Sequence, residues 1–89
     1  MVEDHRHNAS FRITMDSGEV LYQGLVGRGR CETSAYADAL DQAAELKTNI
    51  ETGARGVSVT VHALTPDEYL NLDRAHQEMI RRDWAVASA

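Results

Sequence analysis

Residues 57–64 read Val-Ser-Val-Thr-Val-His-Ala-Leu, so apolar and polar side chains alternate with a period of two. Such alternation is typical of a β-strand that buries one face. Thr65-Pro66-Asp67-Glu68 follows at once and carries the residues of a helix start. Thr65 can cap the helix, Pro66 suits its first position, and Glu68 completes a capping box. This stretch therefore predicts a strand that leads directly into a helix.

A β-hairpin is predicted earlier in the chain. Phe11, Ile13 and Met15 alternate with polar residues, which indicates a half-buried strand. Residues 16–19 form a turn-prone stretch, in which Gly18 can adopt positive φ, and residues 20–26 form a second β-rich run. We expect these two runs to pair.

Two amphipathic helices are expected, one after the hairpin and one after Thr65. Thr33 or Ser34 can cap the first helix, and Gly53 is placed to end it in the left-handed conformation. Its apolar stripe consists of Tyr36, Ala39, Leu40, Ala43, Leu46 and Ile50. The buried side of the second helix is expected to hold Tyr69, Leu72, His76, Met79, Ile80 and Trp84.

The element order β-β-α-β-α predicts an α+β fold. A right-handed crossover through the first helix gives a three-stranded antiparallel sheet of order 2-1-3, with two helices packed on one face. Residues 10–85 form this single domain, residues 1–9 a flexible N-terminal tail, and residues 86–89 a C-terminal tail.

Composition narrows the classes of function. The 89 residues carry a formal charge of −5, so no overall positive field attracts phosphate, and nucleic acid is an unlikely partner. Cys31 is the single cysteine, which excludes an intramolecular disulfide. The sequence has no long apolar run and no signal-peptide pattern, so we expect a cytoplasmic protein without membrane contact.

The face of the sheet opposite the helices is the first candidate binding surface. Its apolar and histidine side chains would be Leu21, Leu25, His62 and Leu64. An apolar cluster on a surface favours a partner interface, and a homo-oligomer is its simplest form. The alternative is that a bulge near Gly24 turns Leu21 or Leu25 into the core.

Acidic residues on the first helix form a second candidate surface. Asp38, Asp41 and Glu45 are spaced i, i+3 and i+7 on the side away from the apolar stripe. Such a row is usually a solvated helix face. It could also dock on a basic groove of a partner protein.

The sequence gives only weak signals for an anion-binding, catalytic or metal-binding site. Gly27-Arg28-Gly29-Arg30 reads either as a flexible connector or as an anion-binding loop in which Arg28 and Arg30 hold the anion. Cys31 follows these arginines, but no base is placed near it by the sequence, so we expect no catalytic residue. No metal-ligand spacing is present, and neither a metal nor a cofactor is expected.

Thr33-Ser34 and the Ala-rich segment 35–44, placed after two strands, resemble antitoxin domains of the HicB type. The resemblance covers less than half of the chain and lacks the Pro and Gly signature ahead of the helix, so it assigns no residue a role. In size and acidity the chain is also similar to small phage-encoded inhibitors of host nucleases.

The sequence as a whole predicts a small acidic protein that is not an enzyme and that binds another protein. An inhibitor or accessory factor that docks on the basic groove of a nucleic-acid-handling enzyme fits the charge, as in phage or mobile-element proteins. One alternative is a nucleic-acid or phosphate-binding module that uses residues 27–30. Another is an antitoxin-like or homodimeric regulatory domain.

Overall fold

Strands β1 (His5–Met15) and β2 (Val20–Gly29) form the predicted antiparallel hairpin. The computed structural model describes residues 5–54 and 56–88, without the side chain of residue 88. Gly18 lies in the turn with φ 94°, a value that few residues other than glycine adopt. The register pairs Thr14 with Val20 and His5 with Gly29, so the hairpin is long and regular.

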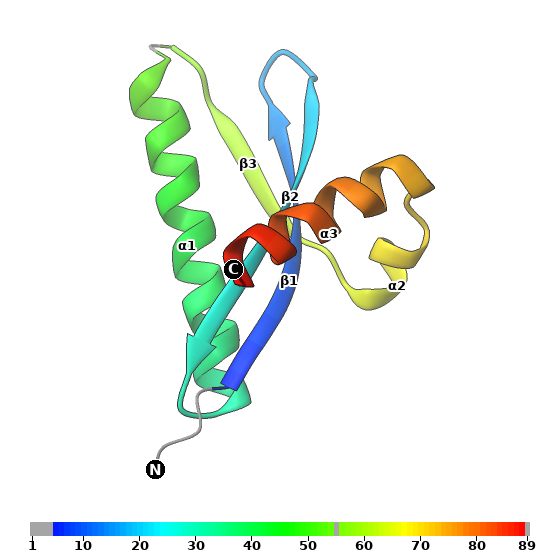
Figure 1. Ribbon diagram of the computed structural model, residues 1–89. Coiled ribbons are helices and arrows are strands. Elements are labelled where there is room, and N and C mark those ends of the chain that lie inside the picture. The colour runs from blue at the N-terminus through cyan, green and yellow to red at the C-terminus, as the bar shows by residue number, and fades with distance from the viewer. Residues whose placement is uncertain (1–4, 55, 89) are drawn as a thin grey trace.

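Strand β3 (Val59–Ala63) completes an open sheet of order β2-β1-β3 (Figure 1). It runs antiparallel to β1 and pairs with Phe11–Met15. The α+β class, the element order and the strand order are therefore confirmed. The strand is shorter at both ends than the alternation over residues 57–64 predicts: it begins at Val59 and ends at Ala63, before the chain turns toward Thr65 and Pro66.

Helix α1 (Glu32–Gly53) starts earlier than predicted. Its N-cap lies two positions before Thr33, the first of the two predicted caps. Cys31 is the N-cap residue, and its N–H donates to the Ser34 Oγ across 3.1 Å. The predictions that Thr33 or Ser34 caps the helix and that Gly53 adopts the left-handed conformation are both wrong. Among the described residues, positive φ occurs at Gly18 and at Gly56, beyond the end of the helix.

The last helical segment is divided into α2 (Pro66–Leu70) and α3 (Arg74–Ser88), where the sequence predicted one helix. The Thr65 cap and its capping box with Glu68 are confirmed. The second helix has its own start, because Asp73 Oδ1 accepts a 2.9 Å hydrogen bond from the His76 N–H.

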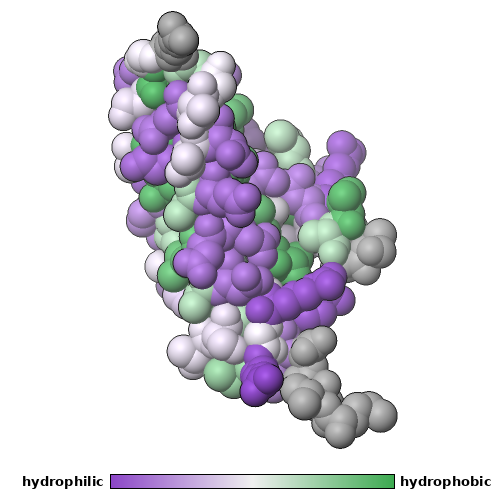
Figure 2. Space-filling view, turned by 90° about the vertical axis from the view of Figure 1, so that its left-hand side faces the viewer, coloured by the Kyte–Doolittle hydropathy of each residue, from purple (hydrophilic) through white to green (hydrophobic). Residues whose placement is uncertain are grey.

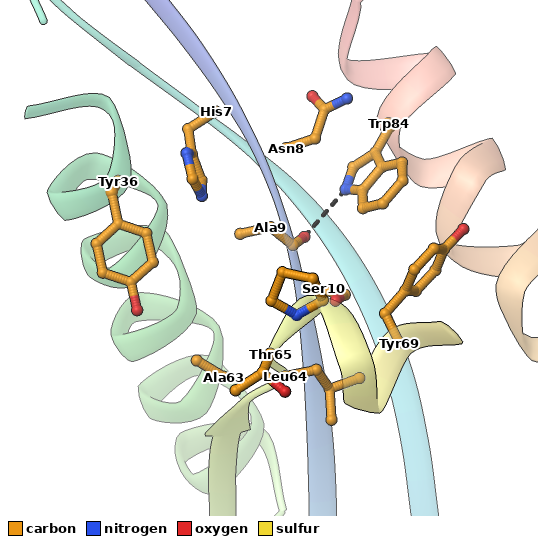
Figure 3. Close-up of a pocket in the computed structure, with 11 residues that line it drawn as sticks. His7, Asn8, Ala9, Ser10, Tyr36, Ala63, Leu64, Thr65, Tyr69 and Trp84 are labelled. Atoms are coloured by element: carbon orange, nitrogen blue, oxygen red, sulfur yellow. Dashed lines mark hydrogen bonds between the residues drawn. The ribbon is translucent and has the colours of Figure 1, made fainter. Parts of the chain in front are cut away.

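Helices α1 and α3 lie on opposite faces of the sheet, so the prediction that both pack on one face is wrong. A side chain at Gly27 would collide with Ala35 and Ala39 of α1, whereas one at Gly24 would collide with Ile80 and Trp84 of α3. Residues 24 and 27 differ in parity, and alternate residues of a strand point to opposite faces. The strands accordingly lie between the two helices (Figures 1 and 3).

The core is built from small residues where α1 crosses β2. A Cβ at Gly27 would lie 1.9 Å from the Ala35 carbonyl oxygen, so only glycine permits this approach. Ala35, Ala39 and Ala43 are the buried residues of the helix. Tyr36 and Leu40 of the predicted stripe are instead exposed, as is Met79 of the predicted buried side of the last helix. Ile80 of that side is fully buried.

Both predicted tails are partly ordered. Residues 5–9 belong to β1 and residues 86–88 belong to α3, so the tail prediction is wrong for these positions. Residues 1–4 and 89 lie outside the described residues. None of the helices within the described ranges has the length and apolar character needed to cross a membrane.

Candidate functional site

The predicted open face does not exist as one surface. The register places Leu21 opposite Ile13 and Leu25 opposite Ala9, on the face that α1 covers. His62 is opposite Arg12 and therefore lies on the other face. Leu25 is half-buried against the core, and Leu21 is 41% exposed near the hairpin turn. The pairing is continuous, so no bulge intervenes at Gly24.

The predicted acidic row has two different roles. Asp38 is half-buried, and its Oδ2 accepts hydrogen bonds from the Arg28 N–H at 2.8 Å and from the Gln42 Nε2 at 3.0 Å. It therefore closes the outer edge of β2 and is not free for a partner. Asp41 and Glu45 are exposed. The surface of the molecule on the side of α1 is largely hydrophilic (Figure 2).

The predicted anion loop is a strand. Gly27, Arg28 and Gly29 belong to β2, and the Arg28 guanidinium donates to the Ala87 carbonyl oxygen at 3.0 Å. Arg30 is exposed beyond the end of the strand. The glycines serve close packing against α1, which is a structural requirement.

Cys31 is an exposed thiol whose Sγ lies 3.5 Å from the Ser34 Oγ. Hydrogen bonds from the Ser34 side chain and backbone lower the pKa of the thiol below its usual value. No described histidine or carboxylate forms a hydrogen bond with it. Within the described part of the chain, no three His, Cys, Asp or Glu residues gather as a metal site.

A cleft of about 440 Å³ lies beside the first half of β1 (Figure 3). We call it the β1-edge cleft. Its lining comes from the sheet and from the helices on both faces of it. The lining residues are His7, Asn8, Ala9, Ser10, Tyr36, Ala63, Leu64, Thr65, Pro66, Tyr69 and Trp84. Of the site residues predicted from the sequence, Leu64 alone lines it.

Aromatic pairs form the two walls of the β1-edge cleft. On the α1 side, the His7 and Tyr36 rings meet edge to face with centroids 5.1 Å apart. On the opposite side, the Tyr69 and Trp84 rings are 5.5 Å apart. The Trp84 Nε1 donates to the Ala9 carbonyl oxygen at 3.0 Å, which fixes the indole against the strand. The walls are therefore held before any ligand arrives.

A small polar cluster holds the end of the cleft where β3 turns into α2. Glu68 accepts a 3.0 Å hydrogen bond from the Thr65 N–H, and its other oxygen lies 3.1 Å from the His62 Nε2. The Thr65 N–H, and after it the His62 side chain, lower the pKa of Glu68. The cluster fixes the position of Thr65 and Pro66 at the cleft.

The lining of the β1-edge cleft contains no Asp, Glu, Lys or Arg. No nucleophilic side chain among the lining residues is hydrogen-bonded to His7. The arrangement offers aromatic and apolar contact together with main-chain groups.

The sequence reasoning missed the cleft because it assigned His5–Ala9 to a tail and the wall residues Tyr36, Tyr69 and Trp84 to the core. One signal was present. His5, His7 and Ala9 continue backward the two-residue spacing of Phe11, Ile13 and Met15. Extending that alternation would have lengthened the strand.

Comparison of the chain with protein-family models, with curated proteins and with solved structures gives no match.

Proposed function

We propose that this protein is a non-catalytic module that binds a segment of another protein in the β1-edge cleft. The observation that carries the proposal is a preformed, aromatic-walled cleft without charged lining residues in a chain of which 26% is charged. A concave apolar site with a few polar groups is the usual form of a binding site.

The residues of the walls support protein binding in particular. Tyr36, Tyr69 and Trp84 are of the types that contribute most to protein interfaces, because they combine a large apolar surface with a polar tip. Tyr36 is 41% exposed and is thus available to a ligand. Its contact with His7 holds the ring at the rim of the cleft.

The charge of the chain adds a preference among partners. The formal charge is −5, and Asp41 and Glu45 are exposed on α1. Complementary charge speeds association, so a partner with a basic surface around the bound segment is favoured. An inhibitor or accessory role toward such a partner is consistent with the proposal.

Selection of peptides from a random phage-displayed library against the purified protein tests this function. Selected peptides are then titrated against the wild type, Tyr36→Ala and the matched control Leu40→Ala. Leu40 is 39% exposed on the same helix and lies outside the β1-edge cleft.

We expect Tyr36→Ala to weaken binding about tenfold or more, as for an aromatic interface residue. Leu40→Ala should bind like the wild type. If no peptide is selected, or if both variants bind selected peptides like the wild type, the proposed function is wrong.

A further inference from the structure

Strand β1 is paired on both sides along only half of its length. Its pairing with β2 runs from His5 to Thr14, whereas its pairing with β3 is limited to Phe11–Met15. Among the described residues, no strand lies beside residues 5–10 on the β3 side. The β1-edge cleft lies at this vacant edge.

The hydrogen bonds of the sheet show which main-chain groups face the vacant edge. In β2, the Gly24 N–H, the Val26 carbonyl and the Arg28 N–H bond to side chains outside the sheet. Main-chain N–H and C=O groups of successive residues point to alternate sides of an antiparallel strand. The main-chain hydrogen bonds between β2 and β1 are therefore made by the odd-numbered residues of both strands. The main-chain N–H and C=O groups of the even-numbered residues of β1 point to the other side, toward β3 and the cleft.

Asn8 and Ser10 are the even-numbered residues of β1 that line the cleft. The Ser10 carbonyl oxygen accepts a 2.8 Å hydrogen bond from the Leu64 N–H. The reciprocal bond from the Ser10 N–H is missing, because the chain leaves the sheet at Thr65 to enter α2. Within the described chain, nothing bonds to the Asn8 N–H or carbonyl, so this edge offers donors and an acceptor in the pattern of a ladder.

We propose that the partner segment binds as an extended strand that adds to β1 beside Asn8 and Ser10. This inference rests on the proposed function and specifies the form of the ligand. A strand in this place would exchange both main-chain hydrogen bonds with Asn8 and accept one from Ser10. Exposed strand edges pair with extended chains in this way, and side-chain pockets then add specificity.

Charge constrains the composition of the added strand. The lining is free of charged side chains, so the stretch inside the cleft is uncharged. Asp67 follows Pro66 at the end of the cleft near β3. A strand antiparallel to β1 brings its N-terminal flank to this end, so a basic residue is favoured on that flank.

A second copy of the chain is disfavoured as the occupant. The vacant edge is recessed between Tyr36 on one side and the Tyr69–Trp84 pair on the other (Figure 3). The β1 strand of another copy carries the same walls, which would meet these walls before the edges could pair.

Backbone N-methylation of a library-selected peptide tests strand addition on the wild-type protein. Methyl groups are placed at one residue at a time, and affinity is measured by titration calorimetry. We expect a loss of about tenfold or more at the one residue whose N–H donates to the Asn8 carbonyl, and small changes at its two neighbours, whose N–H groups point away from β1.

The protein side is tested with Asn8→Pro and the matched control Asn8→Ala. Proline removes the N–H that faces the cleft and breaks no bond to β2, and prolines occur at such edge positions. We expect Asn8→Pro to bind the peptide about tenfold or more weakly than Asn8→Ala, which measures the loss of the side chain alone, with thermal melts confirming that both fold.

The outcomes separate this inference from the proposed function. Peptides that lose affinity with Tyr36→Ala, but show no single residue at which N-methylation weakens binding, overturn strand addition and leave cleft binding intact. A wild-type protein that is dimeric by light scattering and becomes monomeric as Asn8→Pro assigns the edge to a second copy, which also overturns the inference.

Discussion

The Nε1 of Trp84 donates a 3.0 Å hydrogen bond to the carbonyl oxygen of Ala9, which joins the last helix to the central strand. The bond forms one wall of the β1-edge cleft, and the Tyr69 ring packs against the same indole. The stability of the fold and the shape of the cleft therefore depend on the same contact.

Replacing Trp84 tests this link. In Trp84→Phe the ring is smaller and the N–H is lost, so we expect the free energy of unfolding to fall by about 0.5–1.5 kcal/mol for the hydrogen bond, with a further loss from packing. Denaturant titration measures the change. Tyr69→Phe, which removes only a hydroxyl that bonds to exposed Arg81, should cost less than about 0.5 kcal/mol. Equal costs would contradict the role given to Trp84.

The close approach of α1 to β2 predicts a strong difference between two glycines. In Gly27→Ala the new Cβ would lie 1.9 Å from the Ala35 carbonyl oxygen, so we expect a loss of about 1–3 kcal/mol or more, or failure to fold. Gly53 has nothing within 4 Å of the corresponding position. Gly53→Ala should leave stability unchanged or raise it by up to about 1 kcal/mol, because alanine favours helix. Thermal melts of the two variants give the comparison.

Asp38 is expected to act in folding and not in partner binding. Asp38→Ala removes the acceptor of the Arg28 N–H, and a hydrogen bond to a charged group contributes about 1.5–3 kcal/mol. Asp41→Ala, at an exposed position three residues on, should change stability by less than about 0.5 kcal/mol. If chemical denaturation shows no difference between the two, the assignment of Asp38 is wrong. Tests of the acidic surface of α1 should therefore use Asp41 and Glu45.

Glu68 gives the fold a dependence on pH. Its pKa is lowered, first by the Thr65 N–H and then by His62. A carboxyl group with a lower pKa in the folded state stabilises the fold above its unfolded pKa of about 4.3, and this contribution is lost as pH falls through the folded pKa. We expect Glu68→Gln to be less stable than the wild type at pH 7, with the difference shrinking below about pH 4.

Local patterns in the sequence predicted the elements of the fold well. The alternation at Phe11, Ile13 and Met15 and the Thr65-Pro66 start reflect period and capping, which act within a few residues. The break between α2 and α3 was missed although Asp73 is a capping residue type, because the apolar spacing continues across it.

Long-range packing could not be predicted in the same way. Gly27 and Gly29 have the composition of a flexible loop, and only their contact with α1 shows that they replace side chains at a helix crossing. The side on which each helix packs depends on the hairpin register, which sets the face of Leu21 and Leu25. The β1-edge cleft combines residues from β1, α1, α2 and α3, so no local motif marks it.

Amide hydrogen exchange along β1, followed by NMR on the free protein, tests whether this strand is paired on both sides along only half of its length. We expect slow exchange at His7 and Ala9, whose N–H groups face β2, and fast exchange at Asn8, whose N–H faces the cleft. Addition of a selected peptide should slow exchange at Asn8. Slow exchange at Asn8 in the free monomer, or no change there when the peptide binds, would contradict the account.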